Sequence, residues 1–226
     1  MLTRSALLDA AAREVDAHGY GSVAMRHVAR AADVTTGALT FHFPTKSDLF
    51  AEVAELGLTR MRERADEVAR LPVAPLRRIS LLVLALLELL HDDVVARAAV
   101  RLSRELPGTG DWSDSWLPAG REMLRRADEA GQLREGVTPD AVAEMTLHLV
   151  AGTEMCAHGG APASDGGDGD GAPGGGAAEP GGGAGGARFA ALCDLLLYGA
   201  SALRPPDPAP DPPRTASPRT ASGENT

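Results

Sequence analysis

Apolar residues recur every three or four positions through most of residues 1–158, which is the spacing of helices that bury one face. No stretch of this part of the sequence alternates apolar and polar residues over the length of a strand. The pattern therefore predicts an all-α fold. The expected helices cover residues 3–18, 22–30, 35–43, 45–70, 76–90, 92–106, 115–130 and 138–157.

Glycine, proline and short polar residues indicate where the first helices begin and end. We expect the first helix to stop at Gly19 and Ser22 to cap the second. Thr35 is placed to cap the third helix, which should end before Pro44 because proline disfavours helical geometry in the preceding residue. Thr45 then opens a long fourth helix. The sequence thus predicts three compact helices followed by a long one.

Amino-acid composition separates the remaining residues into helical, glycine-rich and proline-rich segments. Residues 76–90 are almost wholly apolar, as expected of a helix at the centre of a core. Residues 159–186 are half glycine and contain no Lys or Arg, so we expect a flexible insert there. Helical spacing returns at 187–204, and a disordered proline-rich tail is expected over 205–226. We expect one helical domain over residues 1–50 and a second over residues 51–158 and 187–204.

The second and third helices have the arrangement of a helix-turn-helix. Val28, Leu39 and Phe43 would bury one shared face, whereas Thr36 and Thr40 would face outward on the third helix. A helix that reads DNA needs short polar side chains near base edges, held on a rigid scaffold. An ordinary helical hairpin gives a similar pattern and is the alternative.

The candidate DNA contacts gather in residues 22–46. Gly37 would let the helix backbone approach a duplex closely because it has no side chain. Lys46, the only lysine of the chain, lies at the start of the fourth helix and is suited to a phosphate contact. We expect contacts from Ser22, Arg26, Thr35, Thr36, Gly37, Thr40, Phe41, His42, Thr45 and Lys46.

Net charge narrows the classes of function. The formal charge of −9 argues against a protein that coats nucleic acid over its whole surface, because acidic residues repel phosphate. Residues 1–50 hold five basic and five acidic residues, so the whole excess lies in residues 51–226. Contact with phosphate is therefore expected from the N-terminal part.

The sequence has no recognisable catalytic triad, metal-ligand cluster or glycine-rich phosphate loop after a strand. We therefore expect no enzyme activity, cofactor or metal. Cys156 and Cys193 favour two buried thiols in a reducing cytoplasm, with a disulfide or a redox sensor as alternatives. The most apolar stretch, residues 79–90, is too short for a bilayer, which takes roughly 20 residues. We expect a cytoplasmic protein without a membrane segment.

Residues 34–50, Val-Thr-Thr-Gly-Ala-Leu-Thr-Phe-His-Phe-Pro-Thr-Lys-Ser-Asp-Leu-Phe, resemble the motif of the tetracycline-repressor (TetR) family of regulators. Within that family the pattern is most similar to the γ-butyrolactone receptors of actinomycetes and their relatives, and residues 101–106 resemble the same subfamily. The resemblance implies an N-terminal DNA-binding domain. It also implies a helical C-terminal domain that pairs its last two helices with a second subunit and encloses an effector pocket.

The resemblance further implies the function. A homodimeric repressor of antibiotic or secondary-metabolite genes would bind a pseudo-palindromic operator in double-stranded DNA. A small apolar effector, either a γ-butyrolactone or an antibiotic or its intermediate, would release it. The resemblance implies that Trp116 lines the effector pocket, and Trp112 is the other candidate for that role. Ordinary packing is the alternative for both tryptophans.

Several positions depart from the family pattern. Thr36 stands where relatives usually have lysine, and Thr40 stands where they usually have tyrosine. Both are typical DNA-contact positions, so altered or lost operator recognition, with action through protein partners, is the alternative function. Asp33 replaces a common turn glycine and is expected to adopt left-handed geometry. The insert at 159–186 is expected to loop out between the two dimerisation helices.

Overall fold

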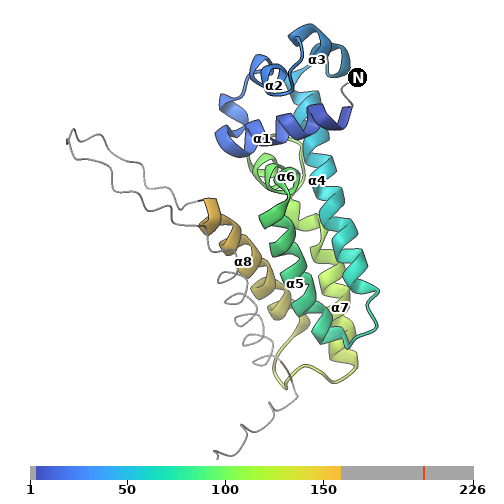
Figure 1. Cartoon of the computed structure of the whole chain (residues 1–226). Helices are drawn as coiled ribbons and strands as arrows, with labels where there is room; N and C mark the ends of the chain where they lie inside the picture. Colours follow the sequence, from blue (N-terminus) through green and yellow to red (C-terminus); the bar gives the residue numbers. More distant parts are fainter. Residues whose placement is uncertain (1–3, 159–200, 202–226) are drawn as a thin grey trace, which may run out of the picture.

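Figure 1 shows a computed structural model in which α1, α2 and α3 gather at one end and longer helices extend away from them. The structure describes residues 4–158 and residue 201. Among these residues every regular element is a helix, apart from one isolated antiparallel bridge between Leu133 and Ser201, and the all-α prediction is confirmed. The elements are α1 (Arg4–Ser22), α2 (Met25–Ala31), α3 (Thr36–His42), α4 (Lys46–Ala69), α5 (Pro75–Asp92), α6 (Val94–Glu105), η1 (Trp112–Ser115), α7 (Leu117–Glu129) and α8 (Pro139–His158).

Several expectations fall on parts of the chain that the structure does not describe. They are the insert at 159–186, the last helix at 187–204 apart from Ser201, and the tail at 205–226. Cys193 and the side chain of Cys156 also lie outside the described residues. These expectations stay predictions.

Two hydrophobic cores share helices α4 and α6. The N-terminal core joins α1, α2 and α3 to the first half of α4, where Phe50 and Val53 are buried. The other core takes the second half of α4, including Met61, together with α5, α7 and α8. Helix α6 sends Leu102 into the first core and Val100 into the second. The two groups of helices are therefore joined by two continuous helices.

Helix α5 lies at the centre of the second core, as its apolar sequence predicts. It packs against α4, α6, α7 and α8, and Ile79, Leu82 and Leu86 are fully enclosed. Glu88, the one charged residue of its apolar stretch, is exposed. No helix in the described part of the chain is long and apolar enough to cross a membrane.

The junction between α1 and α2 corrects one expectation. The chain bends at Gly19, whose φ of 78° suits glycine, and helical geometry then continues to Ser22. The predicted cap by Ser22 is wrong, because the N-cap of α2 is Ala24, which makes no side-chain hydrogen bond to the helix. The reason is tertiary: Glu105 and Phe50 contact Tyr20 and hold the segment after the bend against the first core.

Candidate nucleic-acid interface

Threonines cap the starts of α3 and α4. The Thr35 hydroxyl accepts a hydrogen bond from the Ala38 amide at 3.1 Å, as the sequence predicts. Thr45 opens α4 with a capping box, in which Asp48 and Thr45 each bond the backbone amide of the other. The turn before α3 also follows the prediction, since Asp33 has a φ of 53°. Local sequence therefore sets the start of both helices.

The inward face of α3 is narrow. Leu39 is the only buried residue of the helix, and Phe43, which ends it, is buried beside it in the N-terminal core. The two side chains fix α3 on the scaffold and leave the rest of its surface free. In Figure 1 this surface lies at the end of the molecule away from α5, α7 and α8.

The ten predicted DNA contacts have similar accessibility. Nine of the ten are exposed, and Lys46 is half-buried. Phe41 is the extreme case, since 85% of its surface is open to solvent. The exposed residues are Ser22, Arg26, Thr35, Thr36, Gly37, Thr40, Phe41, His42 and Thr45.

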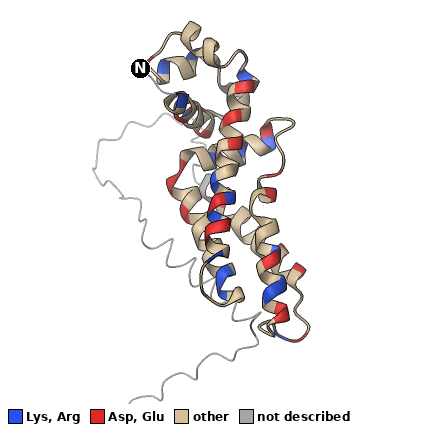
Figure 2. Cartoon of the chain, turned by 90° about the vertical axis from the view of Figure 1, so that its right-hand side faces the viewer, with Lys and Arg blue, Asp and Glu red and all other residues tan. Residues whose placement is uncertain are grey.

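Basic residues flank α3 instead of lying on it. Arg26 and Arg30 of α2 are exposed, and Lys46 lies at the start of α4. Arg4 is committed elsewhere: its Nε donates to Glu52 at 2.7 Å, and the guanidinium lies 4.5 Å from the Phe43 ring centroid. The hydrogen bond to Glu52 raises the pKa of Arg4. Figure 2 shows charged residues along the long helices, whereas the α3 sequence contains none.

Lys46 has partners inside the chain that its sequence position did not predict. Its Nζ donates to the Tyr20 carbonyl oxygen and lies 4.2 Å from the centroid of the Tyr20 ring. The same ring packs edge-on against Phe50, with 5.6 Å between centroids. Lys46 thus joins the start of α4 to the bend after α1.

The bend at Tyr20 is also bound from the other side. The Tyr20 amide donates to a Glu105 carboxylate oxygen at 2.6 Å, and Glu105 lies at the end of α6. One turn earlier, Arg101 donates to the Asp16 carbonyl at 2.8 Å and to Glu105 at 2.8 Å. The backbone of Tyr20 therefore connects α6 to Lys46. Sequence reasoning missed this connection, because it joins residues that lie 26 and 85 positions from Tyr20.

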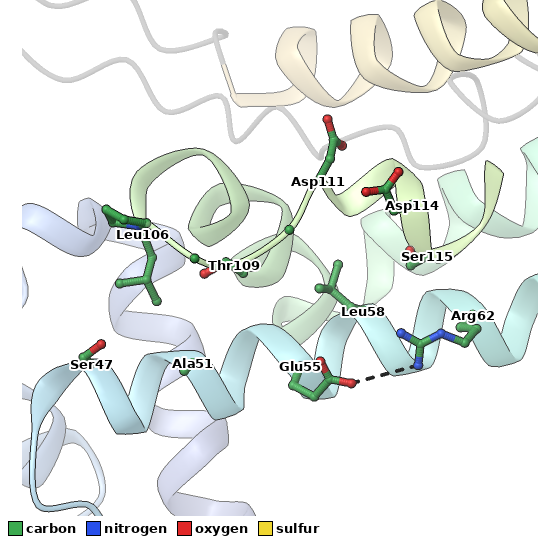
Figure 3. A pocket seen from close by; sticks show the side chains of 13 residues that line it. Ser47, Ala51, Glu55, Leu58, Arg62, Leu106, Thr109, Asp111, Asp114 and Ser115 are labelled. Carbon is green, nitrogen blue, oxygen red and sulfur yellow. Dashed lines mark ion pairs between the residues drawn. The ribbon is translucent and has the colours of Figure 1, made fainter. Parts of the chain in front are cut away.

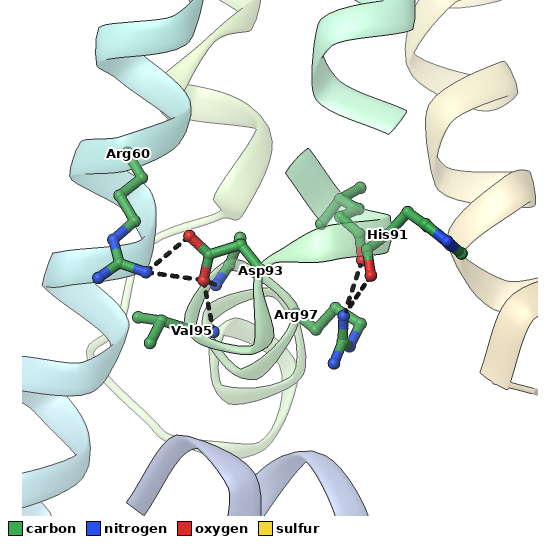
Figure 4. A network of polar contacts seen from close by, with 7 residues as sticks. Arg60, His91, Asp93, Val95 and Arg97 are labelled. Carbon is green, nitrogen blue, oxygen red and sulfur yellow. Dashed lines mark hydrogen bonds and ion pairs between the residues drawn. The ribbon is translucent and has the colours of Figure 1, made fainter. Parts of the chain in front are cut away.

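A second set of polar contacts joins α4, α5 and α6 (Figure 4). Asp93 caps α6 by accepting from the Val95 and Ala96 amides, and both its oxygens accept from Arg60 of α4 at 2.6 and 2.7 Å. Arg97 donates to the His91 carbonyl at the end of α5, at 2.8 Å. An aspartate directly before a helix pattern signals the cap, but only the fold brings Arg60 to it.

The two candidate effector-binding tryptophans are both buried and lie together. Their ring centroids are 5.8 Å apart, with Trp112 in η1 and Trp116 just after it. The indole Nε1 of Trp116 is buried and has no hydrogen-bond partner among the described residues. A buried N–H donor without an acceptor is unfavourable and rare in folded proteins.

A cavity of about 420 Å³ lies between α4 and the loop that follows α6 (Figure 3). It is lined by Glu55 and Arg62, an ion pair at 4.0 Å, and by Asp111 and Asp114 of the loop. Neither tryptophan lines it. It is therefore not the apolar pocket expected beside Trp116. The described residues also hold no group of three or more His, Cys, Asp or Glu placed to bind a metal ion.

The fold and the exposed face of α3 define a helix-turn-helix protein. Residues 7–53 match the family described as "Bacterial regulatory proteins, tetR family". The match covers the N-terminal domain of the chain, which contains α2 and α3. The resemblance inferred from residues 34–50 is confirmed.

Two relatives of known identity are similar in sequence. The chain is 26% identical over 166 residues to the A-factor receptor protein of Streptomyces griseus, a match that covers 72% of this chain and 58% of the receptor. It is 38% identical over 87 residues to the HTH-type transcriptional regulator AcrR of Shigella flexneri, covering 38% of this chain and 40% of that regulator. The matches therefore span less than two thirds of either relative.

Solved structures extend the likeness to the C-terminal helices. A crystal structure of a gamma-butyrolactone receptor, described as an ArpA-like protein, superimposes with a TM-score of 0.60. It is 26% identical, and the match covers 69% of this chain and 79% of the receptor. The helices after α3 therefore share their arrangement with that receptor.

Proposed function

We propose that the chain is a cytoplasmic, ligand-responsive repressor of transcription that binds operator DNA as a homodimer. One observation carries this proposal: of the seven residues of α3 only Leu39 is buried, so the rest of the helix can enter a major groove. The Thr35 cap and the buried Leu39 side chain hold α3 in place, and its other residues are exposed. The regulatory roles named for the relatives support the same function.

In this proposal phosphates are bound from both sides of α3. Arg26 contributes an exposed guanidinium from α2, and Lys46 contributes its ammonium group from the start of α4. Such contacts fix the register of a protein on the duplex but carry no sequence information. Thr36, Thr40 and their neighbours on α3 then face the bases.

Dimerisation is proposed to use α8 together with the predicted helix at 187–204. Met155 of α8 is 64% exposed, an apolar side chain that a second subunit would cover. In a two-fold dimer the two copies of α3 should lie about 34–36 Å apart or a multiple of that distance. The operator should accordingly be close to palindromic.

The effector is proposed to bind beside Trp116. Its unpartnered Nε1–H would donate to an oxygen of the ligand, while the paired indole rings would pack on an apolar group. A γ-butyrolactone with an alkyl chain combines a carbonyl oxygen with apolar surface. The similarity to a gamma-butyrolactone receptor supports this class, and an antibiotic or its intermediate is the other candidate.

We propose that α6 transmits the effect of effector binding from Trp116 to the DNA-binding helices. Trp116 follows η1, which contacts α6 and α4, and α6 ends at Glu105, which binds the Tyr20 amide. Tyr20 in turn binds Lys46 at the DNA-facing start of α4. An effector that favours a different position of α6 would therefore shift the population toward dimers whose α3 helices no longer match adjacent grooves.

A gel-shift experiment with the full-length chain tests the proposal. Duplexes selected by the protein from the DNA upstream of its own gene should bind specifically, with an affinity that falls as salt rises. An alkyl γ-butyrolactone should release them. Arg26→Ala should weaken binding, whereas Arg121→Ala, a matched exposed arginine on α7, should leave it unchanged. Absence of specific, salt-sensitive binding would overturn the proposal and favour action through protein partners.

A further inference from the structure

Helix α3 offers an uncommon set of side chains for a helix that enters a major groove. Arg and Lys bind guanine through two hydrogen bonds, and Asn and Gln bind adenine in the same way. The α3 sequence, Thr-Gly-Ala-Leu-Thr-Phe-His, contains none of these four residue types. Base recognition by α3 therefore cannot use these two-hydrogen-bond pairs.

Phe41 dominates the outward face of α3. It follows Leu39 by two positions, about 200° around the helix, so its ring lies on the side opposite the buried anchor. Gly37 lies one turn before Phe41, and a methyl group built there would meet only the Thr35 hydroxyl, at 3.9 Å. No side chain at Gly37 shields the ring, which is 85% exposed. Contact with an apolar partner would remove this surface from water.

Thr40 adds a methyl group to the same surface. Its hydroxyl donates to the Gly37 carbonyl oxygen at 3.1 Å, so the hydroxyl hydrogen is used within the helix. The side chain is exposed. The accessible surface formed by Thr40 and Phe41 is therefore rich in carbon and poor in hydrogen-bond donors.

We propose that α3 reads thymine, with the Phe41 ring and the Thr40 methyl packed on C5-methyl groups in each half-site. This inference rests on the proposed function, namely that the chain binds operator DNA. The thymine methyl is the apolar group that the major-groove edge of a base pair presents, and Phe and the Thr methyl are suited to contact it. Arg26 and Lys46 hold the helix over these bases through phosphates. Operator half-sites should contain thymine at the positions that face Phe41.

Replacing thymine by deoxyuridine tests the proposal, because uracil lacks only the C5-methyl group. The full-length protein first selects duplexes from a random-sequence library, and each thymine of the selected site is then replaced in turn. We expect roughly a fourfold loss of affinity for each contacted methyl, from the transfer free energy of one buried carbon group. Phe41→Ala should weaken binding to the thymine duplex and remove the further loss caused by uracil at the position it faces.

Val73→Ala is the matched control, because Val73 is an exposed apolar residue outside the helix-turn-helix, and it should keep full discrimination between thymine and uracil. Specific binding that is unaffected by uracil at every position would overturn this inference and leave the proposed function intact. The same uracil loss in Phe41→Ala as in the unmodified protein would also overturn it. Failure to select any duplex would overturn both proposals. Circular dichroism verifies that each variant keeps its helices.

Discussion

Gly57 of α4 lies so close to Ala99 of α6 that a methyl group at Gly57 would come within 2.4 Å of the Ala99 Cβ. The same methyl would lie 2.5 Å from the Val95 carbonyl oxygen, which belongs to the backbone and cannot turn aside. The two helices that join the cores therefore cross at a glycine. Their separation at this point is set by the absence of one side chain.

Gly57→Ala should force α4 and α6 apart. We expect the free energy of unfolding to fall by about 1–3 kcal/mol, the usual effect of overpacking, although alanine is the better helix former. Urea denaturation at a fixed protein concentration measures the change. Gly21→Ala at the end of α1 is the control, because a methyl there meets nothing within 4 Å and should leave stability unchanged or slightly higher. Equal stability of the two variants would contradict the close crossing.

Glu105→Ala should loosen the bend at Tyr20. The Tyr20 amide loses its acceptor, so its hydrogen exchange should become faster, while amides in the middle of α4 keep their rates. In a double-mutant cycle with Lys46→Met we expect a coupling free energy of about 0.5–3 kcal/mol, because both side chains bind the same residue. Additive effects of the two substitutions would argue against a connection through Tyr20.

Lys46→Met should separate the two roles of Lys46. If Lys46 only binds Tyr20, the substitution would change the affinity for DNA but not the salt dependence of that affinity. Loss of a phosphate contact makes the plot of log affinity against log salt shallower by about 0.9 for each phosphate. We expect the shallower slope, measured by fluorescence anisotropy with a selected duplex. An unchanged slope would leave Lys46 with a purely structural role.

Trp116→Phe should affect stability and ligand binding differently. The substitution leaves a gap but also removes the unpartnered buried N–H, so we expect the free energy of unfolding to change by less than about 1 kcal/mol. Affinity for an alkyl γ-butyrolactone should fall about tenfold through the lost hydrogen bond. Trp112→Phe should keep that affinity within about threefold, since the hydrogen bond remains. Calorimetric titration of both variants checks this. An equal loss of affinity in the two variants would show that Trp116 Nε1 does not bind the ligand.

Local sequence was sufficient for the helix-turn-helix because its signals act over a few residues. The Thr35 cap, the Thr45 capping box and the left-handed Asp33 all follow from side chains within three positions of the backbone they contact. Ser22 shows the limit of such signals. A good capping residue did not cap, because Tyr20 is held by Glu105 from a helix 85 positions away.

The sequence by itself determined an all-α chain, the position of α3 and the residues that its outer face exposes, because helical period and caps are local properties. Only the tertiary structure decided how α3 is connected to the rest of the molecule. Tyr20 between Glu105 and Lys46, Arg60 on the cap of α6, and the crossing at Gly57 all join residues far apart in the sequence. No periodicity encodes such pairs, since each depends on where packing of the two cores places whole helices.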